Sequence, residues 1–255
     1  MGGFGAQASY VSGTGTNTLT FTYTIQNGDT DANGISIDAN AISLPAGAGI
    51  ADAAGNPATI VHALVADNTN YIVDTTAATV GTIAIASATG IQNNTLNVGD
   101  VVTVTVPMSE VVNVTGTPQL ALTIGASTVQ ASYSSGTGTN SLSFTYTIQA
   151  GQTDANGISV AANALTLNGG TILDMAGNVT TLTHAAVADN AGYLVDTTAP
   201  TVASVAITGA TGSLANTLNA GDVVTATVTM SEATTVTGNP ELTLKIGGKQ
   251  VQDVY

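Results

Sequence analysis

The chain has 255 residues, of which 44% are hydrophobic, 4% are aromatic and only 7% are charged. The 16 acidic residues are opposed by two lysines and no arginine, so the net charge is −14. Two cations cannot neutralise a run of phosphates, so we expect no nucleic-acid binding and no basic patch for an anionic membrane surface. The absence of cysteine excludes disulfides, thiolate nucleophiles and cysteine-based metal sites. No apolar run reaches the roughly 18 residues of a membrane-spanning helix, so we expect no membrane insertion.

The sequence repeats itself along its whole length with a period of about 122 residues. Residues 96–102 (LNVGDVV) return as residues 218–224 (LNAGDVV), and the motif VDTT stands at both 73–76 and 195–198. Repeats of this kind indicate tandem structural units. Division at the VDTT linkers predicts the C-terminal part of one repeat (1–77, the N-terminal segment), one complete repeat (78–199, the central unit) and the N-terminal part of a repeat (200–255, the C-terminal segment).

The two partial repeats are complementary. Tyr255 aligns with Tyr133 and with Tyr10, and Met1 aligns with Ile246. The C-terminal segment of one molecule and the N-terminal segment of another therefore contain one whole repeat with a short overlap. Two interpretations remain open: the chain is an excerpt from a longer array of repeats, or it is a subunit that polymerises head to tail by completing a split domain.

Alternation of apolar and polar residues with period two predicts strands throughout the central unit. One stretch has Ser and Thr on one face and apolar residues on the other, namely Leu142, Phe144, Tyr146 and Ile148. In chain order, strands are expected near residues 79–88, 99–107, 118–124, 127–133, 140–149 and 157–167. Turns rich in Gly and Asn separate them, and no segment carries the apolar stripe of an amphipathic helix of normal length. The prediction is an all-β fold of tandem immunoglobulin-like β-sandwich repeats, circularly out of phase with the chain ends.

Several motifs mark a resemblance to a known family. Residues 196–202 (DTTAPTV), 221–225 (GDVVT) and 230–233 (MSEA) resemble the tandem Ig-like repeats of giant bacterial adhesins and cyanobacterial surface-motility proteins, as do residues 174–178 (DMAGN) and 52–56 (DAAGN). The resemblance implies an extracellular or cell-surface location. It also implies calcium bound at the joints between units.

Six acidic positions recur in both copies of the repeat, which accounts for 12 of the 16 acids. Following the strands of an antiparallel sandwich places Asp74, Glu110 and Asp174 at one end of the central unit, facing Asp31 and Asp67 of the preceding segment. Carboxylates gathered in this way repel one another unless a cation neutralises them, and Ca²⁺ accepts six to eight oxygen ligands in loose geometry. A second joint is expected to use Asp154, Asp189, Asp196 and Glu232, with Asp52 supplied by a neighbouring molecule.

An alternative remains open for each acid, namely a turn residue that binds its own backbone. This explanation fits Asp100 and Asp222 best, because both lie in Asn-x-Gly-Asp turns. The matching lone histidines, His62 and His184, are expected in a strand with a packing role.

The sequence offers no nucleophile motif and no paired acid and base outside the expected joints, so we expect no enzyme activity. The pattern favours a structural extracellular protein, a stalk or filament of Ig-like domains stiffened by Ca²⁺. Its partners would be further copies of itself or neighbouring repeats of a longer chain. The alternative is an adhesin module that recognises a glycan or a surface through its loops, which predicts aromatic loop residues that are almost absent here.

Overall fold

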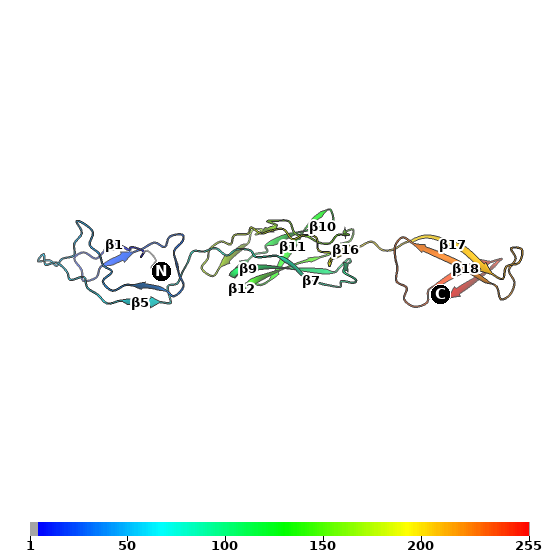
Figure 1. Cartoon of the computed structure of the whole chain (residues 1–255), viewed down its shortest axis with the longest axis horizontal. Helices are drawn as coiled ribbons and strands as arrows, with labels where there is room; N and C mark the ends of the chain where they lie inside the picture. Colours follow the sequence, from blue (N-terminus) through cyan, green and yellow to red (C-terminus); the bar gives the residue numbers. More distant parts are fainter. Residues whose placement is uncertain (1–4, 255) are drawn as a thin grey trace. The chain divides into compact units, whose positions relative to one another are not determined.

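The computed structural model describes residues 5–254, and the side chains of residues 5–248. This described part consists of strands, turns and irregular segments without any helix, so it contains no helical membrane span (Figure 1). The strands form several sheets that are almost entirely antiparallel, consistent with a β-sandwich, and the all-β prediction is confirmed. By its contacts the chain divides into two compact units, Met1–Asp196 and Thr197–Tyr255.

The central unit contains the largest sheet of the chain. Its strands follow the spatial order β14-β10-β11-β12-β9-β15, and β7 also pairs with β9. A small second sheet has the order β13-β16-β8, in which β16 and β8 are parallel. The strands are β7 (Ala84–Thr89), β8 (Thr95–Leu96), β9 (Val101–Thr115), β10 (Gln119–Ile124), β11 (Ser127–Ser135), β12 (Thr139–Thr147), β13 (Thr153–Asp154), β14 (Leu165–Thr166), β15 (Thr171–Asp174) and β16 (Leu194–Asp196).

Two expected strands differ from those observed. The strand expected over residues 99–107 continues as β9 to Thr115, because its last residues, from Val112 on, gain β15 as a partner. The strand expected over residues 157–167 is interrupted by a turn in which Asn163 has a φ of 57°. Only isolated bridges at Ser159 and Val160 and the short β14 remain of it.

The core of the central unit lies between alternating side chains of its long strands. The buried side chains of β9 and β12 alternate with serines and threonines that are partly or fully exposed, and they include Val102, Val104, Val106, Leu142 and Phe144. This is the pattern of strands that bury one face. The rings of Phe144 and Tyr133 pack in a T-shaped arrangement, with their centres 5.9 Å apart and their planes at 70°. The largest fully buried side chains include Leu96, Val102, Val104, Val106, Leu120, Leu122, Ile124, Leu142, Phe144, Ile148, Ile158 and Ile172.

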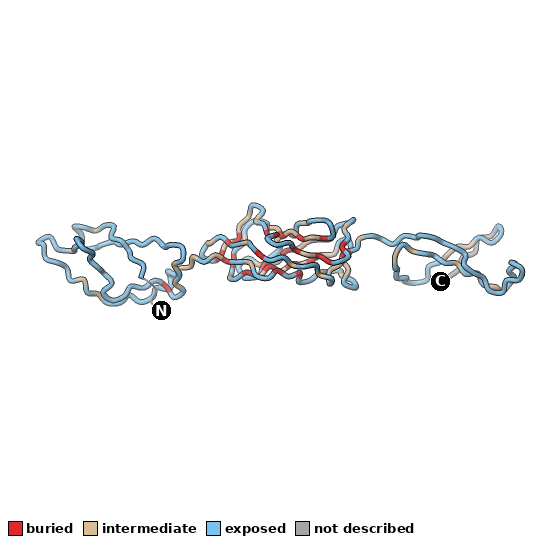
Figure 2. Tube along the Cα trace, turned by 45° about the horizontal axis from the view of Figure 1, so that its top comes forward, coloured by how far each residue is buried: buried red, intermediate tan, exposed pale blue. Residues whose placement is uncertain are grey.

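Within residues 5–77, the N-terminal segment forms two-stranded sheets, β1·β2, β3·β6 and β4·β5. Most of its apolar side chains are exposed, and Figure 2 shows buried residues concentrated in the central unit. Its strands are β1 (Ser9–Ser12), β2 (Thr20–Thr22), β3 (Thr30–Asp31), β4 (Ile35–Ile37), β5 (Val65–Asn68) and β6 (Val73–Asp74).

The C-terminal segment likewise forms two separate pairs, β17·β18 and β19·β20. Every residue of β17 is exposed, although the matching strand β7 contributes Ile85 to the core of the central unit. The strands are β17 (Val202–Thr211), β18 (Val223–Met230), β19 (Glu241–Ile246) and β20 (Lys249–Val254).

Candidate metal centre

The linker that follows β6 is held by hydrogen bonds to the central unit. The side-chain amide of Asn178 donates to the backbone carbonyl of Asp74 at 3.1 Å. The Thr79 N–H donates to the Ser109 hydroxyl at 2.9 Å, and the Ser109 N–H donates back to the Thr79 carbonyl at 2.9 Å. These bonds fix the chain between Asp74 and Thr79 beside β9 and the loop after β15.

Asp174 ends β15 and is buried with only 2% of its surface exposed. Its Oδ1 accepts the N–H groups of Ala176 and Asn178 at 2.9 and 2.8 Å, and its Oδ2 accepts the Asn178 side-chain amide at 2.8 Å. The carboxylate is therefore held in one orientation by its own loop. The Asp-x-Ala-Gly-Asn sequence dictates this loop, as a side-chain turn bonded to its own backbone.

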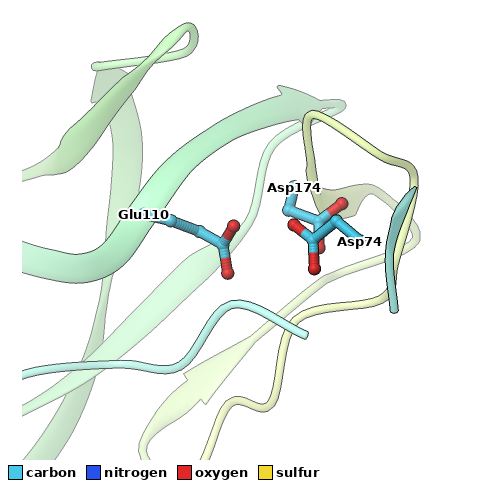
Figure 3. Close-up of side chains that lie close together, drawn as sticks. All are labelled: Asp74, Glu110 and Asp174. Atoms are coloured by element: carbon cyan, nitrogen blue, oxygen red, sulfur yellow. The ribbon is translucent and has the colours of Figure 1, made fainter. Parts of the chain in front are cut away.

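The carboxylates of Asp74, Glu110 and Asp174 converge at this point (Figure 3). Each offers one oxygen, and these oxygens lie within 4.8 Å of one another. Asp74 ends β6, directly before the linker, Glu110 comes from β9 and Asp174 from β15, and the first two are half-buried. Within the described part of the chain, this is the one group of three or more potential metal ligands.

Lysine and arginine are absent from residues 1–244, the stretch that contains all three carboxylates of the cluster. The two lysines of the chain, Lys245 and Lys249, belong to the C-terminal segment. Burial, and then repulsion from Asp74 and Asp174, hold the pKa of Glu110 above its ordinary value. Three carboxylates without a counter-cation form a donor set of hard oxygen atoms, which suits Ca²⁺ with water completing its coordination. The residues present thus fit a calcium ion.

Asp31 and Asp67, expected to face this cluster, are not members of it. Asp31 lies in β3, paired with β6, and its Oδ1 accepts the N–H groups of Asn33 and Gly34 at 3.2 and 2.9 Å. Asp67 accepts the side-chain amide of Asn33. Both acids therefore stabilise the turn after β3 by accepting hydrogen bonds from it.

The matching acids of the central unit brace the equivalent turn. Oδ1 of Asp154 accepts the N–H groups of Asn156 and Gly157 at 3.2 and 2.8 Å, and its Oδ2 accepts the Gly125 N–H at 2.8 Å. Asp189 accepts the Asn156 side-chain amide. Gly157 has a φ of 100°, and a Cβ there would collide with the backbone of residue 190, so the turn requires glycine.

The other predicted ligands of the second joint, Asp196, Glu232 and Asp52, belong to three different parts of the chain. Asp196 ends β16, and Glu232 lies two residues beyond the end of β18 and is half-buried. Asp52 sits in a loop with the same hydrogen bonds as the Asp174 loop, and hydrogen bonds from the side chain and the backbone of Asn56 hold its pKa below the ordinary value. The second joint stays a prediction.

Asp100 and Asp222 act within their own turns, as expected. The N–H of Asn97 donates to Asp100 at 2.9 Å, and the N–H of Asn219 donates to Asp222 at 2.7 Å. These two acids stabilise the turns that directly precede β9 and β18.

His184 has the expected packing role, but it lies in an irregular stretch and not in a strand. Its Nε2 accepts the N–H groups of Ala164 and Leu165 at 2.8 and 3.3 Å, and its Nδ1 contacts the Ala185 carbonyl at 2.8 Å. This arrangement requires a neutral ring with the proton on Nδ1. The ring thereby satisfies the buried backbone of residues 164 and 165.

Sequence reasoning missed the two residues that tie the linker to the central unit, Asn178 and Ser109. Their recurrence as Asn56 and Ser231 is a signal that could have identified them. Ser231 and Thr201 repeat the two hydrogen bonds between Ser109 and Thr79: the Thr201 N–H donates to the Ser231 hydroxyl at 2.9 Å, and the Ser231 N–H donates to the Thr201 carbonyl at 2.8 Å.

No family model matches this chain, and neither a curated protein nor a solved structure is found to be similar to it.

Proposed function

We propose that this chain is a structural extracellular protein whose tandem Ig-like β-sandwich units form a stalk or filament stiffened by Ca²⁺ at the joints. One observation carries the proposal: the linker residue Asp74 lies with Glu110 and Asp174 of the following unit. A cation shared by all three would bind the linker to the central unit and restrict its motion. In repeat proteins each unit contacts only its neighbours, so the stiffness of the joints determines the stiffness of the whole.

The electrostatics of the cluster support a bound cation. Two like charges 4.8 Å apart repel by roughly 0.9 kcal/mol even at the dielectric constant of water. Three such pairs work against the folded joint unless a cation neutralises them. The hydrogen bonds that orient Asp174 keep its carboxylate in place, so the ion would not have to order that ligand first.

The small donor set favours an extracellular setting. Three protein carboxylates, two of them half-buried, suggest weak binding of the kind found in extracellular modules, roughly 10⁻⁴–10⁻³ M. Such a site fills where calcium is millimolar. The chain also lacks cysteine, so its stability does not depend on disulfide bonds.

Calorimetric titration of CaCl₂ into the chain tests the site, with Glu110→Gln as the test variant. Glu241→Gln is the matched control, because it removes an exposed glutamate in β19 at the position where the central unit has Gln119. We expect Glu110→Gln to lose one bound calcium per chain and Glu241→Gln to bind as the parent does. Equal binding by all three chains would overturn the assignment.

Spin labels on either side of the linker test the stiffening itself. Asp38→Cys and Gln130→Cys are exposed positions in the N-terminal segment and the central unit. The distribution of distances between the two labels should narrow when calcium is added, and Glu110→Gln should abolish the narrowing. A distribution of unchanged width in the parent would contradict the proposed role.

A further inference from the structure

We infer that the N-terminal segment of one copy of this chain and the C-terminal segment of a second copy pair with each other and complete one β-sandwich, in the strand register of the central unit. The inference deepens the proposed filament, since it names what joins one molecule to the next. Its evidence is strand pairing and burial, which are independent of calcium.

The N-terminal segment already has half of the expected structure. The pairs Ser9–Thr22 and Tyr10–Phe21 of β1·β2 repeat the register of β11·β12 in the central unit. The ring centres of Tyr10 and Phe21 are 5.7 Å apart at 69°, close to the 5.9 Å and 70° of Tyr133 and Phe144. Yet Phe21 is 42% exposed, whereas Phe144 is fully buried. The β1·β2 hairpin is therefore formed, with the apolar face that carries Phe21 exposed.

The C-terminal segment has the other half. The β17·β18 register reproduces that of β7·β9, including the irregularity that lies between Ile207 and Gly209 in one and between Ile85 and Ser87 in the other. The exposed fraction of Ile207 is 70%, against 7% for Ile85. The pair β19·β20 repeats the register of β10·β11 in the same way.

The pairings that the two segments lack are those that need strands from both. In the central unit, β9 pairs with β12 and with β15, and β10 pairs with β14. The counterparts of β9 and β10 lie in the C-terminal segment, and those of β12, β14 and β15 lie in the N-terminal segment. Strand lengths reflect this: β2 has 3 residues where β12 has 9, and β18 has 8 where β9 has 15.

The β9·β12 pairing of the central unit shows which residues of β2 in one copy and β18 in the other would lie opposite each other. Phe144 lies opposite Val104 and Thr145 opposite Thr103. The same register places Phe21 of one copy opposite Ala226 of the other, and Thr22 opposite Thr225. β20 and β1 correspond to the first and last parts of β11, and Val254 and Ser9 both align with Ser132. The two short strands would therefore follow one another in the joined sheet, with only one of these two residues at the shared position.

A second copy of this chain suits the exposed surfaces better than an unrelated partner. The surfaces are unpaired strand edges flanked by apolar side chains, which favour the addition of further strands. Burying large apolar side chains stabilises the joined sheet. The core residues Val102, Leu120 and Leu122 recur in the complementary segment as Val224, Leu242 and Leu244, whereas Val104 and Val112 are replaced by Ala226 and Thr234. The side chains concerned, each exposed here and buried at its counterpart, include Phe21, Ile25, Ile35, Ile207, Leu218 and Val228.

Disulfide trapping between two single-cysteine chains tests this inference, since the parent chain has no cysteine. Thr22→Cys and Thr225→Cys lie on the face of their strands away from Phe21 and Val224, so they leave the apolar face unchanged. Paired residues of antiparallel strands have Cα atoms about 4.5–5.5 Å apart, which a disulfide spans. When the two chains are mixed under oxidation, the yield of disulfide-linked mixed dimer should be at least ten times the yield of disulfide-linked dimer that either chain gives on its own.

A register control uses Thr229→Cys in place of Thr225→Cys. The shift of four residues moves the thiol by about 13 Å, beyond the reach of a disulfide. Equal trapping at both positions, or no mixed dimer, would overturn the inference. A chain that carries both Thr22→Cys and Thr225→Cys gives a further test. If it forms only an intramolecular disulfide and no disulfide-linked dimers or longer species, the inference is also overturned.

Two further measurements keep the result interpretable. Phe21→Asp should abolish trapping and leave the thermal transition of the central unit unchanged, which shows that the loss is not a failure to fold. Trapping is repeated in EDTA. A mixed dimer in EDTA together with absent calcium binding would refute the proposed calcium joints and support the inference, whereas calcium binding without trapping would do the reverse.

Discussion

The hairpins β1·β2 and β11·β12 have nearly the same sequence and the same local geometry, but only the second is part of a core. In both, the tyrosine hydroxyl accepts a backbone N–H four residues on, at 2.8 Å for Tyr10 and 2.7 Å for Tyr133. The strand opposite β12 is β9, whereas β2 has no such neighbour within the described residues. The comparison shows that the hairpin is determined by its own sequence, and that burial is determined by strands far away in the sequence.

Removing the aromatic ring should give the largest difference between the two hairpins. Phe144→Ala deletes a fully buried side chain and leaves a cavity, which should cost about 3–5 kcal/mol. Phe21→Ala in a dilute chain removes a ring that is 42% exposed, and the loss should be well below half of that. Urea unfolding of both variants measures the free energies, and equal losses would contradict the comparison.

The two histidines should give the next largest effect. His184→Ala leaves the buried N–H groups of Ala164 and Leu165 without their acceptor, at a cost of about 1–3 kcal/mol. His62 accepts the N–H of Ala41 at 2.9 Å in the same way, but in an exposed setting where water can replace it. Thermal unfolding of His184→Ala and His62→Ala should therefore differ, and a larger loss for His62→Ala would be incompatible with the observed burial.

Calcium should stabilise the central unit more modestly. At a free calcium concentration ten times the dissociation constant, the gain is about 1.4 kcal/mol. The transition of the central unit should rise in 1 mM CaCl₂ relative to EDTA, and Glu110→Gln should remove the rise. Glu241→Gln is the control that keeps it. An identical melting curve in calcium and in EDTA would refute the calcium joint.

The pH dependence of Glu110 is the smallest effect. Its pKa is raised in the folded protein, so its ionisation destabilises the fold above the raised pKa, and protonation relieves this as the pH falls towards the ordinary value. In EDTA at pH 7, Glu110→Gln should be more stable than the parent by less than about 1 kcal/mol, the range of partly exposed charge pairs.

The stability advantage of Glu110→Gln over the parent should shrink as the pH falls. In calcium at pH 7 the parent should instead be the more stable of the two. Differential scanning calorimetry from pH 7 to pH 4.5 measures this difference. A Glu110→Gln chain that is less stable than the parent in EDTA at pH 7 would show that the carboxylate makes a favourable contact in the joint.

Local pattern was sufficient to predict the all-β fold and the turn acids. The alternation Leu142, Phe144 marks the buried face of β12, and Asp100 binds within its own turn as expected. The convergence of Asp74, Glu110 and Asp174 followed from counting strand directions in an antiparallel sandwich. These features depend on short stretches of sequence or on simple topology.

Other features depend on contacts that no local pattern contains. The extension of β9 to Thr115 requires β15 as a partner, some 60 residues later in the chain. Asp31 was expected beside Asp74, and although their strands pair, its carboxylate turns back to the Gly34 N–H. The direction of a side chain within a turn depends on which backbone donors are free, and strand counting cannot supply that.

Hydrogen exchange at two protein concentrations tests most directly whether distant strands complete the two segments. The amides of β2 and β18 should exchange rapidly in dilute protein and gain protection as the concentration rises, while those of β12 stay protected throughout. Protection of β2 and β18 that does not change with concentration would contradict completion by a second copy.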